Sequence, residues 1–97
     1  MKKEYQERRD FVFKEVSRLG FEVAKPRGAF YIFAKIPTGY IQESMEFCID
    51  LAEKEQLAVI PGIAFGQAGE GYIRISYAAS FEKLEEAMRR LDRYMNR

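Results

Sequence analysis

The chain has 97 residues, which is enough for one domain with a modest core and too little for two. Its 16 Lys and Arg against 15 Asp and Glu leave a formal net charge of +1, so no long-range field favours nucleic acid or anionic lipid. There is no His and a single cysteine, Cys48, which excludes Ser-His-Asp and Cys-His nucleophiles, the usual zinc ligand sets and an intrachain disulfide.

Apolar runs in the chain are short. None approaches the roughly 18 residues of a membrane span, and the first four residues lead into charge rather than into the apolar segment of a signal peptide. We therefore expect a cytoplasmic protein that interacts with neither membrane nor nucleic acid.

Residues 2–19 are rich in charge, and Tyr5, Val12, Val16 and Leu19 recur at helical spacing before Gly20. This pattern predicts a helix. No Ser, Thr, Asp or Asn precedes its first turn, so we expect it to continue an element that lies upstream.

Two strands and a helix are predicted next. Residues 21–24 are typical of a short strand, residues 25–28 of a turn, and residues 29–36 of a longer strand. Because both faces of the longer strand are largely apolar, we expect it to be covered on both sides. Residues 41–55 are predicted to be a helix whose buried stripe is Ile41, Met45, Cys48, Ile49 and Ala52, flanked by Phe47 and Leu51.

The last third of the chain alternates strand, loop, strand and helix. Residues 57–60 predict a short strand, residues 62–71 hold four of the seven glycines, and residues 71–78 predict another strand. Ser80 is a plausible N-cap for a final helix with Phe81, Leu84, Met88, Leu91 and Met95 on its apolar face. The order predicts an α+β fold with three helices packed on a small mixed β-sheet.

The glycine-rich loop invites a phosphate-binding interpretation, which its context disfavours. A phosphate loop leads into a helix N-terminus and carries a Lys, whereas residues 66–71 lead into a predicted strand and contain none. We interpret the glycines as residues of a turn that needs unusual backbone angles, and we leave open whether this turn lies near a ligand.

Arg74 stands between Ile73 and Ile75 in an apolar predicted strand, where a charge is costly unless it is paired. Its partner could be internal, such as Glu70 or Asp50, or the guanidinium could simply lie exposed. A ligand carboxylate is the third possibility, because the planar fork of Arg matches it with two parallel hydrogen bonds.

The remaining charged and nucleophilic residues carry little functional signal. Arg and Lys in the first and last helices are interleaved with Asp and Glu, as on ordinary solvated faces. Cys48 lies on an apolar stripe without a His to activate it, and is interpreted as a buried structural residue.

Three segments resemble, in order and spacing, the C-terminal small domain of the class I/II aminotransferases, pyridoxal-phosphate enzymes of fold type I. They are residues 26–33 (PRGAFYIF), 59–66 (VIPGIAFG) and 69–78 (GEGYIRISYA). Residues 5–10 (YQERRD) are similar to the interdomain helix that leads into that domain. The resemblance covers essentially residues 1–97, with residues 1–19 as the end of the interdomain helix.

The resemblance implies a function for Arg74, which in this family grips the α-carboxylate of the amino-acid or 2-oxo-acid substrate. It also implies that the Schiff-base Lys, an Asp for the pyridinium nitrogen and the phosphate cup belong to a large domain, which no segment of this sequence resembles. We therefore expect an inactive fragment with no catalytic or cofactor-binding residue, which closes over pyridoxal 5'-phosphate in a homodimeric parent.

Two further functions stay open. The small domain of a pyridoxal-phosphate-dependent carbon–sulfur lyase would have the same appearance, and a freestanding amino-acid-binding regulatory module could share the α+β sheet. On the fragment interpretation we also expect an exposed apolar patch, drawn from the first helix and residues 63–65, where the large domain would sit.

Overall fold

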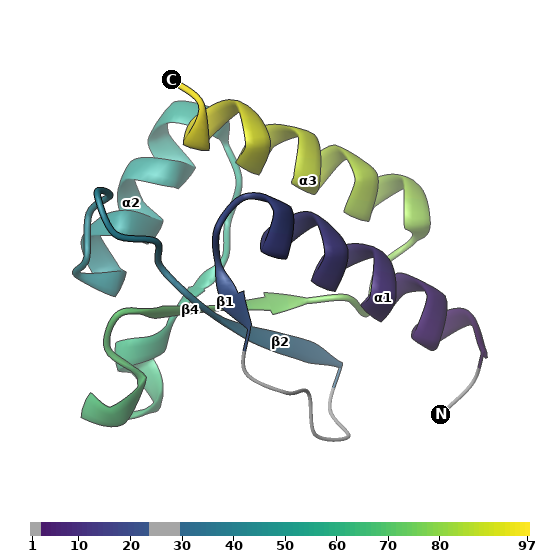
Figure 1. Ribbon diagram of the computed structural model, residues 1–97, viewed down its shortest axis with the longest axis horizontal. Coiled ribbons are helices and arrows are strands. Elements are labelled where there is room, and N and C mark those ends of the chain that lie inside the picture. The colour runs from purple at the N-terminus through teal and green to yellow at the C-terminus, as the bar shows by residue number, and fades with distance from the viewer. Residues whose placement is uncertain (1–2, 24–29) are drawn as a thin grey trace.

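The computed structural model describes residues 3–23 and 30–97 as three helices on one face of a four-stranded sheet (Figure 1). The helices are α1 (Lys3–Arg18), α2 (Ser44–Glu55) and α3 (Phe81–Met95). The strands are β1 (Glu22–Val23), β2 (Tyr31–Lys35), β3 (Ile60–Pro61) and β4 (Tyr72–Ser76). Two short 3-10 helices, η1 (Gly62–Phe65) and η2 (Gln67–Gly69), connect β3 to β4. The predicted α+β class is confirmed; the turn predicted at residues 25–28 lies outside the described residues.

The expectation of a mixed sheet is wrong, because every described pairing is antiparallel. The strand order is β1-β2-β4-β3, and β4 pairs antiparallel with both of its neighbours. Strands β2 and β3, which α2 connects, therefore run in the same direction. They would form a parallel pair if they were adjacent, but β4 lies between them.

The core lies between the sheet and the helices. Alternation along β2 and β4 directs Ile32, Ala34, Ile73 and Ile75 toward the helices, where all four are buried. The helices contribute Val12, Val16, Leu51, Leu84, Met88 and Leu91 to the same cluster. Ser80 caps α3 as predicted, since its Oγ accepts a hydrogen bond from the Lys83 backbone N–H at 3.2 Å.

Two predictions about buried faces are wrong. The apolar stripe expected on residues 41–55 is shifted, because α2 buries Phe47, Cys48 and Leu51 together with Ser44 and Glu55. Met45 and Ile49 are instead about half exposed. The prediction rests on the spacing of apolar residues alone, whereas the buried face of α2 begins with Ser44 and ends with Glu55, which are polar. The second error concerns β2: α1, α2 and α3 cover only one of its faces, and Tyr31 and Phe33 on the other face are half-buried.

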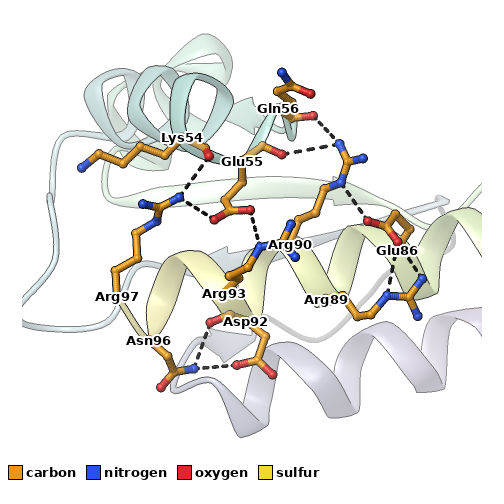
Figure 2. A network of polar contacts seen from close by, with 10 residues as sticks. All are labelled: Lys54, Glu55, Gln56, Glu86, Arg89, Arg90, Asp92, Arg93, Asn96 and Arg97. Carbon is orange, nitrogen blue, oxygen red and sulfur yellow. Dashed lines mark hydrogen bonds and ion pairs between the residues drawn. The ribbon is translucent and has the colours of Figure 1, made fainter.

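Glu55 joins the C-terminal ends of α2 and α3 (Figure 2). Its side chain is only 3% exposed, and it accepts hydrogen bonds from Arg93 Nε at 2.8 Å and an Arg97 Nη at 2.6 Å. Hydrogen bonding to Arg93, with that to Arg97, holds the pKa of the Glu55 carboxyl below its ordinary value. Arg90 donates to the carbonyl of Gln56 at 3.0 Å, which satisfies a backbone acceptor at the end of α2. These charged contacts fix α2 against α3.

Candidate functional site

Arg74 lies in the centre of the sheet on the face opposite α1, α2 and α3. Its neighbours Ile73 and Ile75 point into the core, and the alternation of β4 places Arg74 on the opposite face with Tyr72. Phe33 of β2 and Ile60 of β3 are the cross-strand partners of Arg74. The side chain is half-buried.

Aromatic rings, not a carboxylate, surround the Arg74 guanidinium. Its Cζ lies 4.5 Å from the centroid of the Tyr31 ring and 4.6 Å from that of the Phe65 ring, both within the range of a cation–π contact. Among the residues that the structure describes, the side chain of Arg74 makes no hydrogen bond and no ion pair. The N–H donors of the guanidinium are therefore unmatched by any described acceptor.

Glu70, the first internal partner considered for Arg74, is occupied elsewhere. One of its carboxylate oxygens accepts hydrogen bonds from the backbone N–H of Ser44 at 2.7 Å and of Gly71 at 2.8 Å. Hydrogen bonding to Ser44, and then to Gly71, holds the pKa of the Glu70 carboxyl below its ordinary value. Glu70 thus accepts a hydrogen bond from the first backbone N–H of α2, that of Ser44. The N-cap residue of this helix, Glu43, makes no side-chain capping hydrogen bond.

Asp50, the second candidate, is also engaged. It accepts a hydrogen bond from the Tyr94 hydroxyl at 2.6 Å and forms an ion pair with Lys54 Nζ at 3.2 Å. The hydrogen bond from Tyr94 is the main cause of a lowered pKa of the Asp50 carboxyl. Neither internal pairing weighed for Arg74 is present.

Phe65 reaches Arg74 because the glycine-rich loop folds tightly. A Cβ atom built on Gly62 would overlap the carbonyl oxygen of Gly69, and one on Gly69 would overlap that of Gly62. This backbone-to-backbone contact brings η1 against η2 and directs the Phe65 ring over the sheet. The ring packs edge-on against Phe33, with centroids 5.6 Å apart at an interplanar angle of 83°.

A shallow hollow of about 340 Å³ opens beside the rings. It is lined by Phe33, Phe65, Ala68, Gly69 and Tyr72. The glycines of this loop therefore bring backbone close to backbone beside Arg74. The loop leads into β4 and not into an α-helix, and the N-terminal N–H of α2 is already taken by Glu70, which agrees with the interpretation that this is not a phosphate loop.

Comparison with known proteins identifies the family. Residues 1–91 match the model of the family described as aminotransferase class I and II. The chain belongs to this family.

Individual relatives that match the chain are named as aminotransferases too, in agreement with the family match. The chain is 49% identical over 96 residues to aromatic-amino-acid aminotransferase 2 of Thermococcus litoralis, and 50% identical over 96 residues to an aspartate aminotransferase of Pyrococcus abyssi. The crystal structure of an aromatic aminotransferase from Pyrococcus horikoshii OT3 superposes with a TM-score of 0.89 at 49% identity, over 97% of this chain and 25% of that one. The first two matches cover 98% of this chain but only 24% of each relative, so the chain spans about a quarter of their length.

The structure brings together residues that the sequence analysis did not connect. Tyr31 lies over the Arg74 guanidinium and Phe33 lies directly across the strands from Arg74, and both positions depend on the register between β2 and β4. Phe65 was expected only as part of an exposed patch. It is 48% exposed, whereas Val12 and Val16 in the expected patch on α1 are fully buried, and Phe13 is the exposed aromatic of that helix.

Cys48 is buried, as predicted. Burial raises the pKa of its thiol to about 11. In the described part of the chain, no helix is long and apolar enough to cross a membrane.

Proposed function

We propose that residues 1–97 are the C-terminal small domain of a pyridoxal-phosphate-dependent aminotransferase, with residues 1–19 as the end of the interdomain helix. The complete enzyme would transfer an amino group between an amino acid and a 2-oxo acid, and Arg74 would bind the α-carboxylate of either. One observation carries the proposal. In a chain of this family, Arg74 lies on the face of the sheet opposite the three α-helices, without a carboxylate partner among the described residues.

The chemistry of Arg74 suits this role. A guanidinium offers two parallel N–H donors that match the two oxygens of a carboxylate. Holding the carboxylate fixes the orientation of the substrate about its Cα atom, and therefore which of the Cα bonds is placed to react. An arginine already paired with Glu70 or Asp50 could not do this without first losing its partner.

The described residues do not fit a site for pyridoxal phosphate itself. An amine that forms a Schiff base needs an environment that activates it, and all five lysines that the structure describes are exposed to solvent. They are Lys3, Lys14, Lys35, Lys54 and Lys83. We infer that the cofactor is held by a large domain outside this chain, and that the chain alone is inactive.

The identity of the amino acid is a separate matter. One relative is named for aromatic amino acids and another, at nearly the same identity, for aspartate. Because both share this small domain, the proposal extends only to substrates that carry an α-carboxylate. The family resemblance further implies a cytoplasmic homodimer for the complete enzyme.

The test uses a protein that carries this chain together with a large domain. Arg74→Ala should lower kcat/KM for amino acids by the equivalent of about 2–5 kcal/mol, the range for removing one member of a desolvated charge pair. The matching decarboxylated amines should lose far less, and Arg74→Lys should recover only part, because a point charge lacks the fork. Arg89→Ala is the control, since Arg89 is exposed and pairs with Glu86 on its own helix.

Three results would contradict the proposal. If Arg74→Ala leaves the preference for carboxylate-bearing substrates intact, Arg74 does not bind the carboxylate. If wild-type protein eliminates a thiol from the substrate rather than exchanging amino groups, the parent is a carbon–sulfur lyase. If the 97-residue chain binds amino acids tightly by itself, and no protein longer than this chain is found to contain it, the regulatory-module alternative holds.

A further inference from the structure

We infer that Tyr31 and Phe65 are positioning residues that hold the Arg74 guanidinium ready for a carboxylate; the inference rests on the proposed function of Arg74. The two rings come from different parts of the chain, Tyr31 from β2 and Phe65 from η1. Both lie within 4.6 Å of Cζ, measured to the ring centroid. We call the pair the aromatic clamp.

The clamp is held by the sheet. Tyr31 pairs across the strands with Ser76, two residues beyond Arg74, so it is a diagonal neighbour of the arginine and within reach of its long side chain. Phe33, directly opposite Arg74, packs edge-on against both Tyr31 and Phe65, with centroids 6.1 Å and 5.6 Å away. One ring therefore supports both members of the clamp.

A clamp made of rings suits an arginine that must stay available. A ring stabilises the positive charge through its quadrupole, without accepting the hydrogen bonds that a carboxylate would take. The donors of Arg74 thus stay free while the side chain is held. An ordered side chain has less rotamer freedom to lose on binding, and this raises affinity for the incoming carboxylate.

The first test is nuclear magnetic resonance of the arginine Nε–Hε groups in the 97-residue chain, with the Arg74 signal assigned by its loss in Arg74→Lys. We expect a signal shifted by the ring currents and a rigid Nε–Hε vector. In Phe65→Leu and Tyr31→Leu the shift should diminish and the order parameter should fall. Phe65→Tyr should preserve both, because it keeps a ring.

Phe13→Leu is the matched control, since Phe13 is an exposed phenylalanine on α1 with an exposed fraction near that of Phe65, 41% against 48%. Backbone amide dispersion reports whether each variant is folded. Because Phe65 is half exposed, its Leu variant should fold even if Tyr31→Leu does not. An Arg74 signal whose shift and order parameter are unchanged in folded Phe65→Leu would overturn the clamp.

The second test is kinetic and uses the longer protein. Phe65→Leu should raise KM for amino acids about two- to fivefold, the equilibrium equivalent of one partly exposed cation–π contact, with little change in kcat. KM for the decarboxylated amine should stay constant, and Phe65→Tyr should restore the amino-acid value. Equal losses with both substrates would instead mean a structural role and would contradict the inference.

Failure of the proposed function is recognised separately. Arg74→Ala, with both rings intact, would then leave the preference for carboxylate-bearing substrates unchanged. That result would overturn carboxylate binding by Arg74, and with it the purpose assigned to the clamp, whereas the magnetic resonance experiment would still decide whether the rings order the arginine.

Discussion

The backbones of Gly62 and Gly69 lie against each other so closely that neither residue has room for a Cβ atom. The contact joins the start of η1 to the end of η2 and closes the loop that carries Phe65. Gly62 is also close to the Tyr72 carbonyl oxygen, which a Cβ on Gly62 would approach to 2.7 Å. The position of the Phe65 ring over Arg74 therefore depends on two glycines and on the start of β4.

Substitution of either glycine should disturb the site from a distance. We expect Gly62→Ala to destabilise the fold by about 1–3 kcal/mol, because backbone atoms rather than a flexible side chain must move. Denaturant unfolding measures the change. Ala64→Ser is the control, since it adds one atom at an exposed position of the same loop; an equally stable Gly62→Ala would mean that the two backbones are not in contact.

Glu70 should stabilise α2 through its hydrogen bonds. We expect Glu70→Gln to lower the melting temperature at pH 7, because it removes the negative charge that accepts from the Ser44 and Gly71 N–H groups. Glu43→Gln removes a charge near the same helix end but breaks no side-chain cap, and is the matched control. Similar losses in both variants would assign the effect to general charge rather than to hydrogen bonding.

The contribution of Glu70 should also depend on pH in a defined direction. Its folded pKa lies below the ordinary value of 4.5, so the stabilisation is fully present above that value and is lost as pH falls through the folded pKa. The difference in melting temperature between wild type and Glu70→Gln should therefore shrink in acid. A difference that grows below pH 4.5 would contradict the hydrogen-bonded carboxylate.

Cys48 should react slowly with thiol reagents in the native protein. Burial raises the pKa of its thiol to about 11, so at pH 8 very little thiolate is present and access is restricted. Unfolding in urea should restore the reactivity of an ordinary thiol. Labelling with a chromogenic disulfide, with and without urea, measures the ratio; equal rates would show that Cys48 is accessible in the folded state.

Pyridoxal phosphate should not form a specific adduct with the 97-residue chain. The five described lysines are exposed, so a reversible Schiff base should distribute over several of them. Borohydride reduction followed by peptide mass spectrometry tests this. A stoichiometric adduct at a single lysine would contradict the inference that the cofactor is held outside this chain.

Periodicity predicted most of the fold because local patterns control it. The apolar spacing of α3, its Ser80 cap and the alternation around Arg74 all appear in the structure close to where they were predicted. The strand expected at residues 57–60 is shifted, since β3 comprises only Ile60 and Pro61. The bounds of β3 are set by its pairing with β4, through Ile60 with Arg74 and Pro61 with Ile73. An apolar run in the sequence does not show where such pairing begins.

The contacts at the site could not be predicted in the same way, because they join residues distant in sequence. Glu70 caps a helix that begins 26 residues earlier. Tyr31 lies over Arg74 only through the register of two strands separated by α2 and the glycine loop. An arginine in an apolar strand signalled a site, but the identity of its neighbours required the folded structure.

The most direct test of the account is a crystal structure of the longer protein with a bound 2-oxo acid or substrate analogue. We predict that the Arg74 guanidinium forms two parallel hydrogen bonds of about 2.7–2.9 Å to the α-carboxylate, with the Tyr31 and Phe65 rings still in contact with the guanidinium. A carboxylate bound by other residues, with Arg74 paired to an internal Asp or Glu, would contradict the account.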